Sequence, residues 1–549
     1  WNIDDDRAPS PHPLSSTLPP SWVVCGISVD ESRNIMFVTR YERDCDPIAL
    51  CLPMREIELS LESIDPGHGA DQATAEGENQ GIFACAYRKM SAIISESDRT
   101  MKTGSSCSTD EEKREWWSHR ASLDRQLGLF LQAIEDVWLG GFRHVLRPGK
   151  ILPGMRRFDV PWDSSQHSAM VASLRKSIQS CLSACLPKAF ASKTKPIELS
   201  EQLCTLVLCV AHKATDADSQ RSADKAGHIK YCEDRRGDWL DICSMLWDLY
   251  CYQGAAPSGD DASLDGFSSS LLESMRQFID ANDWAVRDLD DTSSPRQRPH
   301  LILALDKHAQ QIPWECLPVL RDHPVSRVPS IAFLQHRMAM MNGRRSATSP
   351  RDTSGPPSPG KDAGDLLSIL NSAPAGLAGS ATATGDAAAA DLAGLTVGGQ
   401  RVFYVLNPEG DLHRTQTNFA DYLEAQPGWQ GVVGRRPMNY ECEHGLSSSD
   451  IFMYFGHGGA ENYISRSQIR SLSRCSVALL FGCSSGRLKL AGEYDAMGTA
   501  TDYMVGGCPA LVGNLWDVGD KDIDRFAACM LQSWGLDRFS PGKIAVKTD

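Results

Sequence analysis

The sequence predicts an α/β protein with a mostly parallel sheet flanked by helices, preceded by a domain that contains a helical bundle or insert. From residue 401 onward, short apolar runs alternate with amphipathic stretches, as in parallel sheets whose strands are connected by helices. Between about residues 110 and 285, apolar side chains instead recur every three or four positions, which is the period of packed helices. A chain of 549 residues is too long for one hydrophobic core, so we expect two or three domains.

Short strands are expected near the start of the chain. Residues 21–54 contain the runs WVVCGISV, NIMFVTRY and IALCLPM, which are rich in β-branched and aromatic residues and are separated by polar turns. Residues 55–110 are polar and become rich in Gly and Ser toward their end. We therefore expect a loop between these strands and the first helix.

The expected helical insert begins at Asp110. Its first segment, up to Trp138, places Trp and Leu side chains on one face and ends at Gly140 and Gly141. Such stripes are typical of a packed core and not of a cofactor site. Four or five helices of this kind predict a bundle, and similar patterns follow at about 166–186, 198–213, 231–252 and 267–282.

Two different segments separate the insert from the C-terminal α/β region. HLILALD, residues 300–306, predicts a strand, and the proline spacing after it predicts irregular chain packed over a sheet edge. Residues 342–400 hold few aromatic residues and many Pro, Gly, Ser and Ala, so they bury too little apolar surface to order themselves. We therefore expect a first domain over residues 1–341, a disordered insertion or linker over 342–400, and a second domain over 401–549.

The second domain contains five expected strands, namely RVFYVLN, WQGVVG, SSSDIFMYFG, SVALLFG and PALVGNLW. Helices are expected in HRTQTNFADYLEAQ, at residues 467–472, in AGEYDAMGTATDYMVGG and in DKDIDRFAACMLQSW. Ligands of parallel sheets bind beyond the carboxyl ends of the strands. Two glycine-rich segments, FGHGG (455–459) and FGCSSG (481–486), fall at such ends and form the candidate site.

The composition argues against several classes of function. A net charge of -15 does not fit a general nucleic-acid binder, which needs a basic face, and the longest apolar runs are too short to span a membrane. The 18 cysteines include no C-x-x-C pair, which argues against zinc ribbons and thioredoxin-like sites. Their apolar surroundings favour reduced thiols of a cytosolic or nuclear protein. Because the chain starts at Trp1 and not at Met, we expect it to be a fragment.

FGCSSG carries two candidate nucleophiles, Cys483 and Ser484. Read as G-x-S-x-G, it matches the elbow of α/β-hydrolases, whose triad follows the order Ser, acid, His. The last histidine in the sequence is His457, so Ser484 lacks the base that this fold supplies. His457 and Cys483 end successive strands and can approach each other at the rim of the sheet. Two plain glycine turns are the alternative, but a His in one and a Cys in the next favour a Cys-His dyad.

The neighbouring glycines fit the same chemistry. Gly458 and Gly459 leave room for a substrate backbone. The amides of Gly458 and Cys483 are the expected oxyanion hole, because backbone N–H groups at such a turn can hold the negative charge that develops on a carbonyl oxygen.

The C-terminal residues closely resemble separase, the caspase-like (clan CD) cysteine endopeptidase that opens cohesin at anaphase. The resemblance rests on YFGHGGAENYI and on LLFGCSSGRLKLAGEYDAMGTATDYMVGGCPALVGNLWDVGDKDIDRF, and it is dense from about Arg401 to Phe526. LDKHAQQIPWECLPVL and YVLNPEGDLHRTQTNF fit it too. In residues 1–290 only the helical character matches the family's substrate-binding part.

This resemblance implies a caspase-like catalytic domain over 401–549 and a substrate-binding, pseudo-protease-like domain over 1–341. It implies a catalytic dyad of Cys483 and His457 that cleaves the kleisin subunit of cohesin after Arg, in a Ser-x-x-Glu-x-Arg type of site, to trigger sister-chromatid separation. It further implies inhibition by securin, which places a substrate-like segment in the same cleft, and no metal or organic cofactor. The protein is then expected in the cytoplasm and nucleus, at chromosomes and the spindle in mitosis.

Recognition of a substrate Arg requires a carboxylate, ideally one that pairs with the guanidinium through two hydrogen bonds. NLWDVGDKDIDRF supplies Asp517, Asp520, Asp522 and Asp524 just after the fifth strand, although acids at the start of a helix are also ordinary capping residues. The resemblance assigns the Arg pocket to Asp524, with Trp516 as a wall.

Two other functions stay open. One is a related caspase-like or CHAT-type protease with another substrate, and the other is an inactive protease-like scaffold that binds regulators. Ser358-Pro and Ser540-Pro resemble minimal proline-directed phosphorylation sites, which would make a cyclin-dependent kinase a partner, although turn chemistry explains each equally well. No direct nucleic-acid or membrane partner is expected.

Overall fold

The structure is a computed structural model that describes residues 13–57, 81–104, 107–147, 172–180, 199–219, 227–252, 261–281, 299–348, 401–492, 494–534 and 536. The chain divides into two units, residues 1–330 together with 397–549, and residues 331–396. Of the second unit the structure describes helix α10 (Ile331–Thr348). The first residues of the expected linker are therefore helical, and the rest of it, with LLSIL and Ser358, lies outside the described residues, as does Ser540. The expected domain boundaries stay predictions.

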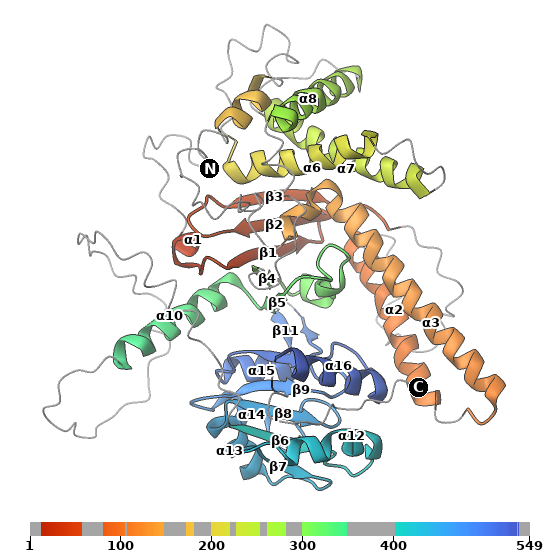
Figure 1. Cartoon of the computed structure of the whole chain (residues 1–549), viewed down its shortest axis with the longest axis vertical. Coiled ribbons are helices and arrows are strands. Elements are labelled where there is room, and N and C mark those ends of the chain that lie inside the picture. Colours follow the sequence, from red (N-terminus) through yellow and green to blue (C-terminus); the bar gives the residue numbers. More distant parts are fainter. Residues whose placement is uncertain are drawn as a thin grey trace, which may run out of the picture. The chain divides into compact units, whose positions relative to one another are not determined.

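The first sheet has five strands in the order β3-β2-β1-β4-β5 (Figure 1). They are β1 (Trp22–Asp30), β2 (Ile35–Tyr41), β3 (Ile48–Pro53), β4 (His300–Leu305) and β5 (Val325–Val328). β1 pairs antiparallel with β2 and parallel with β4. The strands expected at 21–54 and 300–306 are confirmed. β5 was not expected, because its four residues lie between two prolines and are too few to show an alternating pattern.

Two long helices, α2 (Ile82–Thr103) and α3 (Asp110–Ala133), form a hairpin, drawn in orange in Figure 1. The prediction of a loop over residues 55–110 is wrong for the part that α2 occupies. This helix buries side chains at helical spacing, namely Phe83, Ala86, Met90 and Ile93. Polar residues before it dominate the composition of the segment and conceal this period. α3 starts as expected, with Thr109 and Glu112 forming a capping box.

The helical insert is confirmed by α6 (Glu201–Ser219), α7 (Gly227–Tyr252) and α8 (Asp261–Ala281), and residues 172–180 are helical as well. Their apolar faces share one hydrophobic core with the first sheet. Arg143, in a short 3-10 segment after α3, donates to Asp238 of α7 at 2.6 Å and to Asp136 at 2.8 Å. The pair with Asp238 attaches α7 to the segment that follows the hairpin.

The second sheet is entirely parallel and has the strand order β12-β9-β8-β6-β7. Its strands are β6 (Val402–Leu406), β7 (Gln430–Val433), β8 (Ile451–Phe455), β9 (Val477–Leu480) and β12 (Leu511–Gly513). All five strands expected in this region are therefore present. Every residue of β6, β8 and β9 is buried, as in parallel strands that are covered on both faces.

Helices cover both faces of the second sheet. One hydrophobic core joins it to α12 (His413–Glu424) and α16 (Asp520–Ser533). The other core joins it to α13 (Asn439–Ser448), α14 (Arg466–Arg470) and α15 (Thr499–Val505). Successive residues of one strand serve opposite cores, with Phe452 in one and Met453 in the other. The expected architecture of a parallel sheet between helices is thus confirmed.

One expected helix of this region is wrong. Only the second half of AGEYDAMGTATDYMVGG is helical, as α15, and the first half contributes to a two-stranded hairpin of β10 (Lys489–Ala491) and β11 (Tyr494–Met497). Gly492, with φ of +64°, lies in the turn of this hairpin. Helix α13 was not expected, because its sequence NYECEHGLSS is too polar to show a clear apolar face.

No helix in the described part of the chain is long and apolar enough to cross a membrane. The cysteines whose side chains the structure describes are free, and several of them, such as Cys25 and Cys442, are buried. The expected burial is confirmed for Cys204, whereas Cys209 is partly buried and Cys529, in the apolar stretch AACML, is exposed.

Candidate active site

His457 and Cys483 follow two neighbouring strands of the second sheet. β8 ends at Phe455, β9 ends at Leu480, and the two strands pair in parallel. Both residues therefore lie at the carboxyl edge of the sheet, where parallel sheets bind their ligands. The rings of Phe455 and Phe481, 4.8 Å apart between centroids, pack directly beneath them. The two loops thus begin at residues whose side chains pack against each other.

The two loops touch each other at Gly482. A Cβ atom on this residue would overlap the carbonyl oxygens of Gly456 and Gly458, so only glycine allows the backbones to come this close. Gly458 has φ of +68°, in the left-handed region that favours glycine. The hydroxyl of Tyr454 donates to the carbonyl oxygen of His457 at 2.8 Å. The close approach at Gly482 brings the two loops together, and the hydrogen bond fixes the histidine loop to the end of its own strand.

We expect the substitution Gly482→Ala to lower the free energy of unfolding by about 1–3 kcal/mol, because the backbone of one loop must move to admit the methyl group. Thermal unfolding of purified protein measures the effect. Gly128→Ala is the matched control, since Gly128 lies within α3 with no atom near its Cβ position, and alanine there raises helix stability. Equal unfolding temperatures for Gly482→Ala and the unsubstituted protein would contradict the close approach.

Cys483 begins a turn that is strained at Ser484. Ser484 has φ of +52°, which is costly for a residue with a side chain. Its amide donates to the carbonyl oxygen of Trp516 at 3.1 Å, and its Oγ donates to Asp517 at 2.6 Å. The Sγ of Cys483 donates to the carbonyl oxygen of Val518 at 3.2 Å. Residues 516–518 therefore hold both candidate nucleophiles.

The thiol of Cys483 is protonated in this geometry. Burial raises the pKa of the Cys483 thiol, and the negative charges of Asp517, Asp520 and Asp98 raise it further. The thiolate is the nucleophilic form of cysteine. Cys483 therefore needs a base that takes its proton when it reacts.

His457 is held by a carboxylate. Its Nε2 lies 2.8 Å from Oδ2 of Asp411, and this hydrogen bond lowers the pKa of Asp411. Because an ionised carboxylate only accepts hydrogen bonds, Nε2 carries the hydrogen and Nδ1 is left as the acceptor in the neutral ring. The Asp411 loop is itself fixed by Asn407, whose Oδ1 accepts from the amide of Leu412 at 2.9 Å.

One cavity contains both His457 and Cys483. It encloses about 280 Å³ of empty space, part of it open to solvent. Its lining residues are Leu412, Thr415, Gly456, His457, Phe481, Cys483, Asp520, Ile523 and Asp524.

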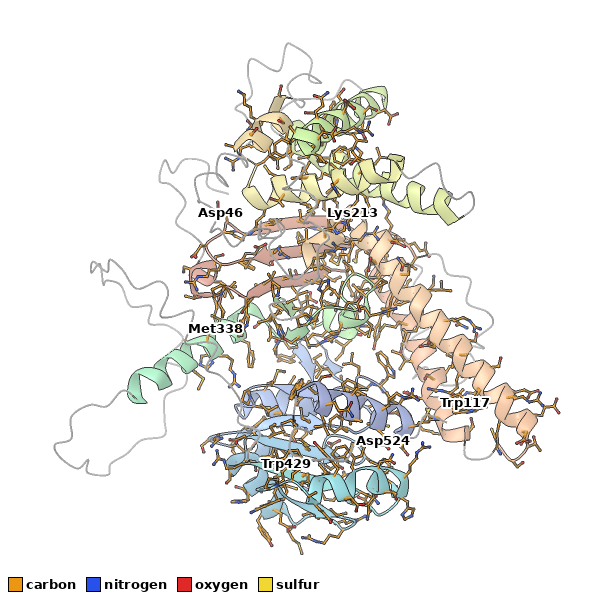
Figure 2. All side chains as sticks on the ribbon, viewed as in Figure 1. Asp46, Trp117, Lys213, Met338, Trp429 and Asp524 are labelled. Carbon is orange, nitrogen blue, oxygen red and sulfur yellow. The ribbon has the colours of Figure 1, made fainter. Side chains whose placement is uncertain are left out.

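Asp524, labelled on α16 in Figure 2, is the buried charge of this cavity and is only 1% exposed. Its Oδ2 accepts from Asn418 at 2.9 Å, whereas its Oδ1 has no hydrogen-bond partner among the described residues. Burial raises the pKa of Asp524, while the hydrogen bond from Asn418 opposes the shift. An unpartnered oxygen on a buried carboxylate is costly. Such a group fits a site that receives a cationic ligand.

The structure brings together four of the residues singled out in the sequence, Cys483, His457, Asp520 and Asp524. The amides of Gly458 and Cys483 donate to no other group in the described ranges. Cys483 lines the cavity, whereas Gly458 lies outside its lining. Trp516 is half-buried and holds Ser484 through its carbonyl group, and it lies outside the lining of the cavity. The roles assigned to these residues stay predictions.

Two contributors to the site were missed in the sequence, Asp411 and Asn418. They lie 46 and 106 residues along the chain from the side chains that they contact, His457 and Asp524. A signal for Asp411 did exist, because NPEGDL follows the first strand of the second sheet and so falls at the same edge as the two glycine-rich segments. Among the described residues, no group of three or more His, Cys, Asp or Glu side chains could hold a metal ion.

A parallel sheet between helices, with a histidine and a cysteine beyond neighbouring strands, defines a caspase-like fold with the residues of a cysteine peptidase. Residues 31–523 match the family model described as the separin protease domain. The chain therefore belongs to the separin, or separase, family of cysteine proteases, and it contains the protease domain of that family.

Similar proteins come from distant organisms. The chain is 30% identical over 522 residues to separin of Emericella nidulans, covering 94% of this chain and 20% of that protein. It is 29% identical over 525 residues to separin of Schizosaccharomyces pombe, covering 95% and 23%. The chain thus spans about a fifth of the length of these curated relatives. A crystal structure of the separase–securin complex of Saccharomyces cerevisiae matches the fold with a TM-score of 0.62 at 21% identity, covering 97% of this chain and 29% of that one.

Proposed function

We propose that this chain is a cysteine endopeptidase that cleaves the kleisin subunit of cohesin after an arginine and so triggers sister-chromatid separation. The observation that carries the proposal is the buried carboxylate of Asp524, with one unpartnered oxygen, in the same cavity as Cys483 and His457. A cavity that holds a nucleophile, a base and a carboxylate for a cationic side chain has the parts that such a cleavage requires.

In the proposed reaction, the Sγ–H of Cys483 turns from Val518 and gives its proton to Nδ1 of His457. The thiolate attacks the carbonyl carbon after the substrate arginine, and the amides of Gly458 and Cys483 receive the charge that develops on the carbonyl oxygen. The tetrahedral intermediate then collapses, the C–N bond breaks, and the histidine passes the proton to the leaving amine. Water, deprotonated by the same histidine, hydrolyses the thioester and regenerates the thiol.

Asp524 recognises the substrate arginine in this proposal. Its free Oδ1 is the acceptor for the guanidinium, and the aliphatic part of the arginine lies along Phe481 and Ile523. The cavity is therefore selective for arginine over neutral substrate side chains. A neutral side chain would leave the buried charge of Asp524 without a compensating partner.

The separase of Saccharomyces cerevisiae forms a complex with securin. We propose by analogy that a securin binds this chain and places a substrate-like segment in the cavity of Cys483. A cyclin-dependent kinase is a further proposed partner, through Ser358 or Ser540. Action on cohesin requires the protein to reach chromosomes, so we propose that it occurs in both the cytoplasm and the nucleus.

Peptide cleavage tests the proposal. The protein is incubated with a Ser-x-x-Glu-x-Arg peptide that extends beyond the arginine, and with the same peptide carrying citrulline, which has the shape of arginine without its charge. We expect cleavage after arginine, and turnover of the citrulline peptide lower by at least about 100-fold, because a buried charge pair is lost. Cleavage of both peptides at equal rates would point to another caspase-like specificity. If the protein cleaves neither peptide, and also fails to cleave a kleisin protein, the result would point to an inactive scaffold.

A further inference from the structure

Helix α2 contacts the loop that precedes α16. Oδ1 of Asp98 accepts from the amide of Asp517 at 3.3 Å, and Oδ2 lies 4.0 Å from the guanidinium of Arg487. One turn further along α2, the methyl group of Met101 lies 3.2 Å from the position of a Cβ on Gly519. Asp98 and Met101 are three residues apart and so lie on one face of the helix. This face touches the loop at both of its ends.

The same loop holds the active-site turn on its other side. The carboxylate of Asp517 accepts from Ser484, and the carbonyl oxygen of Val518 accepts from the thiol of Cys483. Gly519 is the N-cap of α16, the helix that carries Asp524. Residues 517–519 therefore lie between α2 and the candidate nucleophile, and a displacement of α2 would reach Cys483 through two hydrogen bonds.

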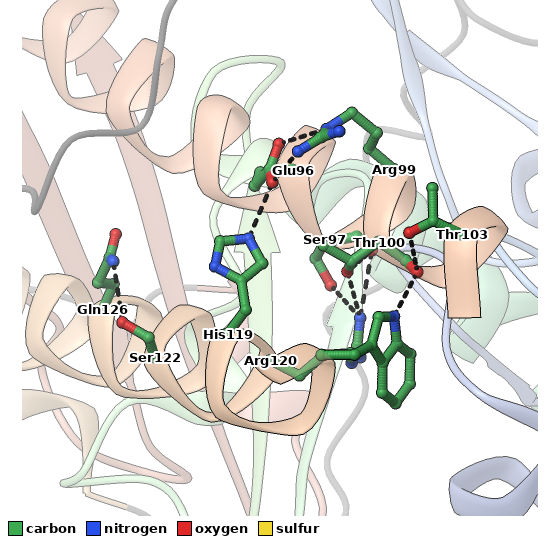
Figure 3. Close-up of polar contacts among 10 residues, drawn as sticks. Glu96, Ser97, Arg99, Thr100, Thr103, His119, Arg120, Ser122 and Gln126 are labelled. Carbon is green, nitrogen blue, oxygen red and sulfur yellow. Dashed lines mark hydrogen bonds and ion pairs between the residues drawn. The ribbon is translucent and has the colours of Figure 1, made fainter. Parts of the chain in front are cut away.

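Helix α3 fixes the part of α2 that makes these contacts (Figure 3). The indole N–H of Trp116 donates to the carbonyl oxygen of Thr100 at 2.8 Å. The guanidinium of Arg120 donates to the carbonyl oxygen and hydroxyl of Ser97 and to the hydroxyl of Thr100 at 3.1–3.2 Å. Ser97 directly precedes Asp98 along α2, and Thr100 follows it two positions later. Contacts from α3 thus fix the position of α2 around Asp98, and Asp98 in turn contacts loop 517–519.

The charge of Asp98 is costly where it lies. Burial raises the pKa of Asp98, and the negative charge of Asp517 raises it further, while Arg487 and Lys102 oppose the shift. Two carboxylates placed this close repel each other. The hydrogen bond that Asp98 accepts from the loop stabilises the structure and offsets this cost. A neutral side chain of the same shape could accept the same hydrogen bond.

We propose that Asp98 is a positioning residue: it holds loop 517–519, and through Asp517 and Val518 it sets the orientation and reactivity of the Cys483 thiol. This inference rests on the proposed peptidase function for its effect on turnover. Its effect on the thiol itself does not depend on that function. The α2–α3 hairpin would then control a nucleophile that belongs to the other sheet.

Two substitutions separate the hydrogen bond of Asp98 from its charge. Asp98→Ala removes both, whereas Asp98→Asn keeps an oxygen that can accept from the amide of Asp517. Asp124→Asn, at an exposed position of α3, makes the same chemical change on the hairpin away from the loop and is the control. For each protein we measure kcat and KM on the arginine peptide, the rate of Cys483 alkylation by iodoacetamide between pH 6 and 10, mapped by mass spectrometry, and the unfolding temperature.

We expect Asp98→Ala to lower kcat about tenfold with KM changed less than twofold, since a misplaced nucleophile affects the chemical step and not the binding of arginine. Asp98→Asn should recover most of kcat. In both variants the alkylation profile of Cys483 should move to lower pH, because one of the negative charges that face the thiol is removed while Asp517 and Asp520 remain. Asp124→Asn should change none of these quantities.

An unchanged kcat and an unmoved alkylation profile in Asp98→Ala would overturn the proposal. A loss of kcat that follows only the unfolding temperature, with no rescue by Asp98→Asn, would overturn it too and leave Asp98 as a structural residue. If Asp98→Ala does not fold, the alkylation profile of Asp98→Asn decides. If the unsubstituted protein cleaves no peptide, the proposed function fails, and the alkylation profiles still decide whether Asp98 acts on Cys483.

Discussion

Replacement of Cys483 with alanine is expected to lower the rate of cleavage after arginine by at least about 10⁴-fold, because a nucleophile has no substitute in a covalent mechanism. Cys483→Ser should be nearly as inactive. A serine hydroxyl is far less acidic than a thiol, and the negative charges of Asp517 and Asp520 near this position oppose its ionisation. The measurement is cleavage of a fluorogenic peptide that ends in arginine. Cys529→Ala is the control, since Cys529 is an exposed thiol of α16.

Ser484 provides the opposite test, because it is the other candidate nucleophile of FGCSSG. Its hydroxyl donates to Asp517 at 2.6 Å, so it helps to hold the turn. Ser484→Ala should therefore weaken catalysis and leave Cys483 reactive. Full activity of Cys483→Ala, together with loss of activity in Ser484→Ala, would reverse the assignment of the nucleophile.

The substitution Asp524→Asn is expected to lower kcat/KM for arginine peptides by about 10³-fold, since loss of one partner of a buried charge pair costs about 3–5 kcal/mol. The kcat/KM for the citrulline peptide should change little. Asp522→Asn is the matched control, because Asp522 is an exposed acid on the same helix with an ion pair to Arg525. Equal losses for the arginine and citrulline peptides in Asp524→Asn would remove the assignment of the arginine pocket.

The same substitution should not destabilise the free protein. Because burial raises the pKa of Asp524 in the folded state, the folded chain binds this proton more tightly than the unfolded chain does. That stabilising contribution is complete below the unfolded pKa and is lost as pH rises through the folded pKa. At pH 8 the ionised carboxylate therefore costs stability, and asparagine removes that cost while it can still accept from Asn418. Thermal unfolding should show an equal or higher Tm for Asp524→Asn at pH 8, with a smaller difference at pH 4.

The sequence predicted the two reactive residues because each directly follows a buried strand. Strand ends are a local property, visible in IFMYFGH and VALLFGC, and parallel pairing then brings the two ends together. Asp411 also follows a buried strand, and the same rule could have found it. Asp98 had no comparable signal. Asp98 contacts a residue 419 positions away, and nothing in the sequence of an amphipathic helix distinguishes one acid on its polar face from another before its neighbours are known.

The local sequence pattern led to wrong predictions in two segments where different structural signals competed. The segment before α15 has helix-forming residues such as Ala491, Glu493 and Met497, yet the turn at Gly492 and the tight approach of Gly498 to the backbone of Arg487 make a hairpin there. In α2 a helix was missed. The polar composition of the residues before it led to the prediction of a loop, although α2 itself has a clear apolar stripe. Composition averaged over a long window is a poor guide where a helix starts within it.

The most direct test of the account is to label the protein with an acyloxymethyl ketone that ends in arginine and to map the adduct by mass spectrometry. The reagent needs a reactive thiol, an arginine pocket and a base within reach of both. We predict an adduct on Cys483 that is absent in the variants His457→Ala and Asp524→Asn and with a citrulline reagent. A folded protein that gives no adduct, or one labelled equally at other cysteines, would contradict the claim that Cys483, His457 and Asp524 form one working site.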